Sequence, residues 1–570
     1  MRSREPIRRG VRIDDRGVSP EIVIAVASRR DRVELSSRPA WRNRIRRSRL
    51  ALDDALREGR RVYGVSTGVG NASSRPVGPR EQIEYTRAIM DQHGCGVGEP
   101  LSEEEGRAVM FARLVSLAKG YSAVRFSLLE ALRDLLNRGV VPAIPRFGSV
   151  GASGDLTPLS YVAAVMAGDR EARYQERIVP AKRALRAAGL APFVFAPKET
   201  LAIMNGTSVM TALGILAVER LRRIVEVAER ASALAVEVLH GRSQAFHPLV
   251  HAVKPHRGQI ESAGNIRAAL RGSRLLDPPH VEGRPVQDRY SVRCSPQVLG
   301  ATRDALEWAW RLLGIELNSV NDNPLVDPGG GGVLFGGNFY GGHVALAMDL
   351  VKIAAASTAD LLDRQFALLV ESPHNMGLPE TLVPYGGCGV KGLQITCSAL
   401  AALAVQRSTP DSTLSRSTEC ANQDKVSMGL NAAVNGGQVL AVGDLRELSR
   451  QRVEILASEG DRVHGSGDLR RVNLRAASAK PPDQVGSQAQ LPIHASNIPK
   501  LRVGCTERIG QTADIQHARN RTQFCRPVFD LREGISRRQI AYDDNKRLHL
   551  AAAHMRIEHA VSDARLVIGR

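Results

Sequence analysis

Two long helical patterns constrain the fold of this chain most strongly. The stretches VMTALGILAVERLRRIVEVAERASALAVEVL (209–239) and VALAMDLVKIAAASTADLLDRQFALLV (344–370) each repeat apolar residues at helical spacing over more than 25 residues. An aromatic content of only 4% fits closely packed helices better than a β-sandwich. We therefore predict a mainly α protein built around a long central bundle. A third helix is expected where apolar residues recur at the same spacing, at Leu299, Leu306, Trp310, Leu313 and Leu317.

Composition divides the chain into four segments. Residues 1–41 form an N-terminal extension, residues 42–200 alternate short helical patterns with glycine-rich turns, and residues 201–457 carry the long helices. In residues 458–570 the apolar periodicity fades while Pro, Gly, Ser and Arg intermix. This tail is either disordered, an unusual appendage, or not the product of the same reading frame. The expected strands are short, at RRVYGV (60–65) and VLFGG (333–337).

The charge and cysteine content exclude several classes of protein. A net charge of +19 would ordinarily suggest an anionic partner. The densest basic run, RNRIRRSR (42–49), has no nucleic-acid-binding signature beside it, so we interpret it as a solvated helix face and expect no nucleic-acid partner. The seven cysteines form no CxxC pair, and no uninterrupted apolar run reaches about 18 residues. We expect no metal, no membrane segment and a cytoplasmic location.

The glycine-rich stretch GSVGASGDLTPLSY (148–161) has three readings. Ser153 or Asp155 could cap the helix that follows, or the glycines could cradle a phosphate, although the lysine of a P-loop is absent. In the third reading the backbone cyclises. The amide nitrogen of Gly154 attacks the carbonyl carbon of Ala152, whose oxygen leaves as water, and Ser153 loses its hydroxyl as a second water. From the spacing of this stretch alone the cap reading is favoured, because such turns are common.

Several motifs together resemble the aromatic amino acid ammonia-lyase and aminomutase family, which includes the histidine, phenylalanine and tyrosine ammonia-lyases. They occur in the family's order over residues 42–443: YGVSTGVG, GSVGASGDLTPLSY, NGTSVM, QDRYSVRCSPQ, NDNP, GGNFYGGH and ECANQDKVSMG. The resemblance implies an electrophilic 4-methylidene-imidazole-5-one (MIO) formed from Ala152, Ser153 and Gly154. It also implies a fumarase/aspartase-like helical architecture and a homotetramer whose active sites combine residues from three chains.

The resemblance also implies roles for residues outside the turn. Tyr63 is implied to remove the β-proton of the substrate, and Arg293 to pair with its carboxylate through a bidentate guanidinium. Phe339 is implied to flank the prosthetic group. Glu419 and Gln423 are implied to bind the substrate; they lie four residues apart, so on a helix they would share one face and could both line a pocket. The remaining implied contacts to the substrate or the prosthetic group are Gln92, His93, Asn205, Gln287 and Tyr290.

A serine hydrolase is a competing hypothesis, because Gly64 to Gly68 fits the GxSxG pattern. That motif requires a helix directly after its serine, whereas the residues after Ser66 read as a loop. We therefore disfavour the hydrolase.

The ring pocket is expected to decide the substrate. A wholly apolar pair at positions 92 and 93 accompanies phenylalanine in the family, whereas His93 offers a partner to a phenol or an imidazole. Histidine-specific relatives usually carry Glu where this chain has Gln423. We therefore order the substrates as tyrosine, phenylalanine, histidine. The leading hypothesis is an ammonia-lyase. The alternative is a 2,3-aminomutase, which adds the ammonia back to give a β-amino acid. The third hypothesis is an inactive scaffold, because the tail at residues 458–570 is atypical.

Overall fold

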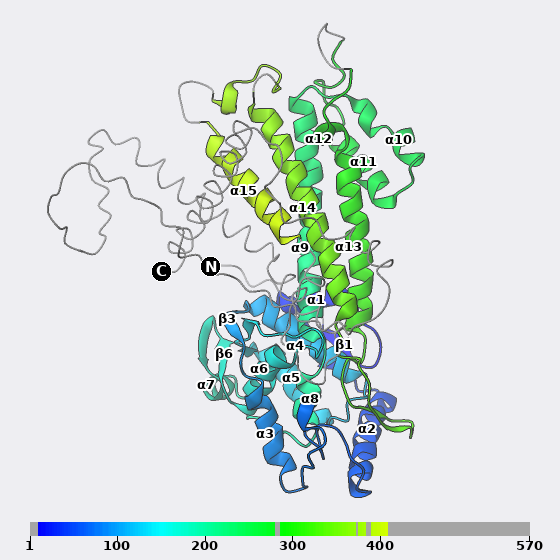
Figure 1. Cartoon of the computed structure of the whole chain (residues 1–570), viewed down its shortest axis with the longest axis vertical. Helices are drawn as coiled ribbons and strands as arrows, with labels where there is room; N and C mark the ends of the chain where they lie inside the picture. The colour runs from blue at the N-terminus through cyan, green and yellow to red at the C-terminus, as the bar shows by residue number, and fades with distance from the viewer. Residues whose placement is uncertain (1–9, 280–285, 372–373, 384–388, 409–570) are drawn as a thin grey trace, which may run out of the picture. The chain divides into compact units, whose positions relative to one another are not determined.

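The computed structural model describes residues 10–279, 286–371, 374–383 and 389–408, and all of them belong to one compact unit (Figure 1). Helices predominate among them, which confirms the expectation of a mainly α protein. Glu419, Gln423 and the segment 458–570 lie outside the described residues. The division of the chain into four segments therefore stays a prediction.

Three long helices run side by side and pack against one another: α9 (Ser208–Val238), α13 (Ser295–Leu317) and α14 (Gly342–Val370) (Figure 1). The two long helices expected from the sequence begin and end within two residues of α9 and α14. Helix α11 (Arg257–Ala269) packs on α13 and α9, and α15 (Lys391–Arg407) packs on α14. This arrangement is the predicted central bundle.

The expected apolar stripe of α13 forms part of the core, with one exception. Leu299, Leu306, Leu313 and Leu317 are buried. Trp310 is only half-buried, because its indole lies against the Arg222 guanidinium at 4.0 Å and donates a hydrogen bond to Glu21. The stretch Glu199–Val238 is long and apolar enough to cross a membrane, but its most apolar window is entirely buried within the protein. A buried core helix has the same properties.

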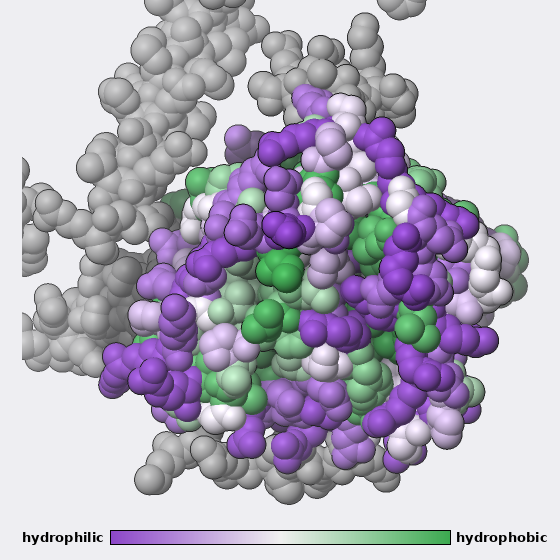
Figure 2. Space-filling view, turned by 90° about the horizontal axis from the view of Figure 1, so that it is seen from below, coloured by the Kyte–Doolittle hydropathy of each residue, from purple (hydrophilic) through white to green (hydrophobic). Residues whose placement is uncertain are grey.

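Shorter elements in residues 10–204 surround α4, which is buried along almost its whole length. Four small sheets occur in the described residues: parallel β1–β2, antiparallel β3–β5, antiparallel β4–β6–β7, and antiparallel β8–β9. Viewed from the end that carries α2 and α3, hydrophilic side chains surround hydrophobic ones near the middle (Figure 2). The elements before α9 are β1 (Gly10–Ile13), α1 (Pro20–Ala27), β2 (Arg32–Leu35), α2 (Pro39–Arg57), η1 (Gly70–Ala72), α3 (Gln82–Gln92), β3 (Val97–Pro100), α4 (Glu103–Ala118), α5 (Phe126–Arg138), β4 (Val141–Pro142), β5 (Pro145–Phe147), α6 (Leu156–Ala167), β6 (Glu171–Tyr174), β7 (Arg177–Pro180), α7 (Ala181–Ala187) and α8 (Glu199–Met204). The remaining elements are η2 (Ser243–Phe246), α10 (Pro248–Ala252), α12 (Tyr290–Arg293), β8 (Leu325–Asp327), β9 (Gly332–Leu334) and η3 (Glu380–Leu382).

The two strand predictions had different outcomes. The stretch 60–65 is a turn and not a strand, because the amides of Val65, Ser66 and Thr67 all donate to the Val62 carbonyl at 2.9–3.2 Å. A chain that bonds to itself in this way leaves no amides for a neighbouring strand. The strand expected at 333–337 is confirmed in part, since β9 pairs with β8 but ends at Leu334.

The arginine run at 42–49 lies on α2, and several of its side chains have partners within the chain. Arg42 stacks on the Phe126 ring at 4.5 Å, and Arg49 pairs with Asp53 at 2.6 Å. The opposite face of α2 buries Trp41 and Ile45. The arginines of the run are exposed or partly exposed, in agreement with the predicted solvated helix face.

Candidate active site

The motif at 148–155 folds into a tight, largely buried turn. The Ser153 amide donates to the Val150 carbonyl at 2.8 Å, and Val150 and Gly154 form an antiparallel bridge that closes the turn. Ala152 is 8% exposed, and Ser153 is half-buried. Gly154 has a φ of +81°, a left-handed conformation that favours glycine.

Two distant segments enclose this turn. A Cβ atom at Gly154 would lie 2.7 Å from the Gly206 carbonyl oxygen and 3.2 Å from that of Phe339, so only glycine fits there. The Asn205 side-chain amide donates to the Ser153 carbonyl at 3.3 Å. The structure therefore brings Asn205 and Phe339 to the turn. A buried turn with small residues and no Cβ at its third position is what cyclisation of residues 152–154 requires, so these residues fit an MIO group.

Asp155 does not cap its own helix α6, which corrects one of the three readings. Its carboxylate accepts hydrogen bonds from the amides of Val209 and Met210, at 2.7 and 3.1 Å, and thus caps the start of α9. It also accepts from the Ser149 hydroxyl at 2.6 Å. Burial raises the pKa of Asp155 to about 6, although these hydrogen bonds and the nearby Arg113 favour its charged form. The carboxylate joins the turn to the long bundle.

A buried group of charged residues beside the turn was missed by the sequence analysis. Lys198 and Asp322 form an ion pair at 2.6 Å with both side chains fully buried. Arg113, from α4, donates to the Ala202 carbonyl and to the Asn321 side chain. Burial lowers the pKa of Lys198, and it lowers the pKa of Arg113 to about 10. The NDNP motif marked Asp322, but no pattern marked its partners.

These charges fix α8, the short helix that ends just before Asn205. Lys198 directly precedes α8 and accepts the Ala202 amide on its carbonyl, while Arg113 binds the Ala202 carbonyl. Buried charges that are paired and hydrogen-bonded hold their elements in one geometry. Helix α8 therefore presents Asn205 to the turn from a fixed position.

Tyr63 lies in a loop that packs on the same helix. Its hydroxyl accepts a hydrogen bond from the Gly70 amide at 2.9 Å. A Cβ atom at the neighbouring Gly64 would lie 2.5 Å from a side-chain methyl of Leu201 in α8, so the Leu201 side chain packs against the backbone of this loop. No α-helix follows Ser66, since Thr67 forms a bridge with Pro76 and only the short η1 comes next. The geometry required for a serine hydrolase elbow is absent from this loop.

Gln92 and His93 stand at the end of α3, which packs on both α8 and α6. Gln92 is exposed. A ring nitrogen of His93 lies 2.8 Å from the Ile89 carbonyl, and the His93 carbonyl accepts from Ser160 of α6 at 3.3 Å. The pair predicted to select the ring thus lies on elements that contact those of the turn.

Gln287, Tyr290 and Arg293 lie at the opposite end of the bundle, around α12. Tyr290 is 72% exposed, and Arg293 stacks on its ring at 4.5 Å. Helix α13 starts just after α12 and ends near Asn321, and its 23 residues span about 34 Å. Within one chain the structure therefore does not bring these three residues to the turn.

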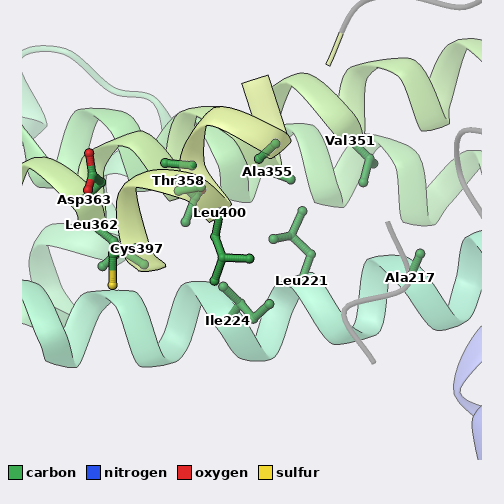
Figure 3. Close-up of a pocket in the computed structure, with 13 residues that line it drawn as sticks. Ala217, Leu221, Ile224, Val351, Ala355, Thr358, Leu362, Asp363, Cys397 and Leu400 are labelled. Atoms are coloured by element: carbon green, nitrogen blue, oxygen red, sulfur yellow. The ribbon is translucent and has the colours of Figure 1, made fainter. Parts of the chain in front are cut away.

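A separate cavity of about 210 Å³ lies between α9, α14 and α15 (Figure 3). Its walls are almost wholly apolar, including Leu221, Ile224 and Leu400. Burial raises the pKa of Cys397 in its wall, and Asp363 accepts a hydrogen bond from Ser398. The cavity shares no lining residue with the turn at 152–154. Among the described residues, no group of three or more His, Cys, Asp or Glu could hold a metal.

Comparison with known proteins agrees with this geometry. The family model for aromatic amino acid lyases matches residues 18–445. The chain is 41% identical over 431 residues to a histidine ammonia-lyase of Caldanaerobacter subterraneus subsp. tengcongensis, covering 75% of this chain and 84% of that protein. For a histidine ammonia-lyase of Myxococcus xanthus the identity is 40% over 429 residues, with the same coverage. The structure of a tyrosine aminomutase from Streptomyces globisporus superimposes with a TM-score of 0.70 at 36% identity, covering 76% of this chain and 85% of that one.

Proposed function

This chain belongs to the aromatic amino acid lyase family, and from that premise we propose that it eliminates ammonia from an aromatic L-amino acid whose ring forms hydrogen bonds. The observation that carries the proposal is the buried turn at residues 152–154. Its third residue is a glycine in a conformation and a space that exclude any side chain. An MIO group formed there would supply an electrophile for the substrate amine.

The residues around the turn then have distinct tasks. Asn205 holds the Ser153 carbonyl, and Asp155 ties the turn to the start of α9. Tyr63 receives the β-proton on its phenol oxygen, where the Gly70 amide donates a hydrogen bond. The Gly70 N–H thus fixes the position of the oxygen that takes the proton.

We propose that the site is completed by other copies of the chain, in a homotetramer. Arg293, the residue implied to bind the carboxylate, precedes α13, a helix about 34 Å long that separates it from Asn321. Apolar side chains at helical spacing also stand exposed on α14: Leu346 at 58%, Leu350 at 36% and Ile353 at 43%. A second copy would both cover this stripe and supply Arg293 to the turn.

The proposed substrates are tyrosine and histidine, with phenylalanine third. His93 favours a ring with a hydrogen-bonding group. The names of the relatives favour histidine, which conflicts with the order expected from the sequence. Against histidine, this chain has Gln423 where histidine-specific relatives usually carry Glu. Both substrates therefore belong in the first assay.

A 2,3-aminomutase is the second candidate, favoured by the similarity to the tyrosine aminomutase. The same residues would serve, but the arylacrylate would be held until ammonia returned to the β-carbon. The product would then keep the mass of the substrate.

The deciding experiment incubates the purified full chain separately with tyrosine, histidine and phenylalanine and resolves the products by mass spectrometry. A lyase releases an arylacrylate and free ammonia, while an aminomutase yields a β-amino acid. Tyr63→Phe is expected to abolish either product yet leave the mass of the turn peptide equal to that of the parent chain. If no product forms from any of the three, the inactive scaffold replaces both proposals.

A further inference from the structure

Two tyrosines bind neighbouring amides of one loop. The Gly70 amide donates to the Tyr63 hydroxyl at 2.9 Å, and the Val69 amide donates to the Tyr85 hydroxyl at 2.9 Å. Tyr85 comes from α3, outside every motif that the sequence analysis used. We infer that Tyr85 is a positioning residue for Tyr63: it anchors the loop to α3 and so holds the Gly70 amide on the Tyr63 phenol. This inference rests on the proposed function only for its catalytic consequence.

The loop is otherwise closed mainly on itself. The Gly68 amide donates to the Arg75 carbonyl at 3.0 Å, and the Val77 amide donates to the Ser66 carbonyl at 3.0 Å. Such bonds fix the shape of the loop but not its position relative to the helices. The bond from Val69 to Tyr85 joins the loop to a neighbouring helix. Because Val69 and Gly70 are consecutive, a displacement that breaks this bond also moves the Gly70 amide.

Helix α3 also makes the anchor useful for the site. Tyr85 stands about two helical turns before His93 on the same element, and α3 packs on α8. Helix α8 ends just before Asn205, the residue that contacts Ser153. Through Tyr85, the base and the ring-selecting pair are fixed to one helix beside the turn.

The chemistry of Tyr85 suits an anchor better than a second base. Burial raises the pKa of Tyr85, and negative charge on the nearby Tyr63 raises it further, against the Val69 hydrogen bond and Arg75. Burial therefore disfavours the charged form of Tyr85.

The test removes only the Tyr85 hydroxyl, as Tyr85→Phe in the full chain, and measures hydrogen exchange resolved to single amides. Exchange at both Val69 and Gly70 is expected to accelerate by about fivefold or more. Tyr63→Phe removes the hydroxyl that accepts from the Gly70 amide, so it gives the exchange rate of that amide without this hydrogen bond. Tyr174→Phe is the matched control, because its hydroxyl bonds the Ala187 carbonyl at 3.3 Å, away from the loop. It should leave both loop amides unchanged.

If Tyr85→Phe accelerates Val69 alone and leaves Gly70 at the parent rate, the inference is overturned. This readout does not require turnover, so an inactive parent chain would refute the proposed function without deciding the inference. Where the parent is active, kcat should fall about 10- to 100-fold with little change in KM. The isotope effect with β-deuterated substrate should also grow, because proton removal has become slower. Loss of folded protein alone would also lower kcat with KM unchanged, but it would leave the isotope effect as it is in the parent, so the isotope effect distinguishes a positioning role from a loss of stability.

Discussion

The two ends of the helical bundle differ in how complete they are within one chain. At the start of α9, Asn205 and Asp155 are buried. Asn205 donates a hydrogen bond to the Ser153 carbonyl of the turn, and Asp155 accepts one from the Val209 amide. At the α12 end, Tyr290 is 72% exposed, and Arg293 donates only to the Asp288 carbonyl among the hydrogen bonds described for it. The side chains at the start of α9 have partners within the chain, whereas Tyr290 at the α12 end is mostly exposed. Within one chain the structure thus forms the turn proposed to become the electrophile, but it does not bring to that turn Arg293, the residue proposed to bind the carboxylate.

The largest effect should come from breaking the buried end. Ser153→Ala removes the hydroxyl that must leave during cyclisation, so we expect kcat to fall by at least about 10³-fold. The fold should persist, because Ser153 is half-buried and alanine is smaller. Activity with the proposed substrates and circular dichroism check both parts.

Ser66→Ala is the matched control for that experiment. Ser66 is the serine of the GxSxG pattern, and its hydroxyl accepts from the Val62 amide at 2.8 Å. We expect most activity to survive with a loss of stability of about 1 kcal/mol. Activity that survives Ser153→Ala but not Ser66→Ala would reverse the roles assigned to the two serines.

The exposed end is tested by complementation. Arg293→Ala should be inactive alone, as should Ser153→Ala, but refolding the two together should restore about a quarter of the parent activity if each site takes the two residues from different copies. Arg289→Ala, at an exposed neighbour that bonds His374, is the control and should stay active. Mixtures without any activity would indicate that each chain forms its own complete site.

Local sequence patterns located the long helices and the glycine-rich turn, but they missed contacts between residues that lie far apart in the chain. Spacing alone located α9 and α14, because each buries a continuous apolar face. It failed at residues 60–65, where the Val62 carbonyl collects three amides instead of pairing in a sheet. Lys198 and Tyr85 act through residues about 124 and 16 positions away, so no local pattern marks them.

Removing one partner of the buried ion pair between Lys198 and Asp322 should lower the stability of the folded protein. Lys198→Met leaves Asp322 buried without its partner, and we expect a loss of about 3–5 kcal/mol in the free energy of unfolding. The double variant Lys198→Met with Asp322→Leu should recover most of it. Urea unfolding measures both. A loss below about 1 kcal/mol in the single variant would contradict a structural role for the pair.

A smaller effect is expected from the pH dependence of Asp155. Its pKa is raised from 3.8 to about 6 in the folded chain, so the folded state binds more protons than the unfolded state between these values. This group therefore costs stability as pH rises from about 4 to 7, by about 2–3 kcal/mol. Asp155→Asn should lack that part of the pH dependence in urea unfolding. An unchanged pH profile would show that the carboxyl titrates normally.

The most direct test of the account is the mass of the tryptic peptide spanning residues 147–170, which has no internal Lys or Arg. Cyclisation at Ala152, Ser153 and Gly154 predicts a peptide lighter by two waters in the parent chain and a peptide of unmodified mass in Ser153→Ala. A parent peptide of unmodified mass would contradict the electrophile, and with it both the lyase and the aminomutase.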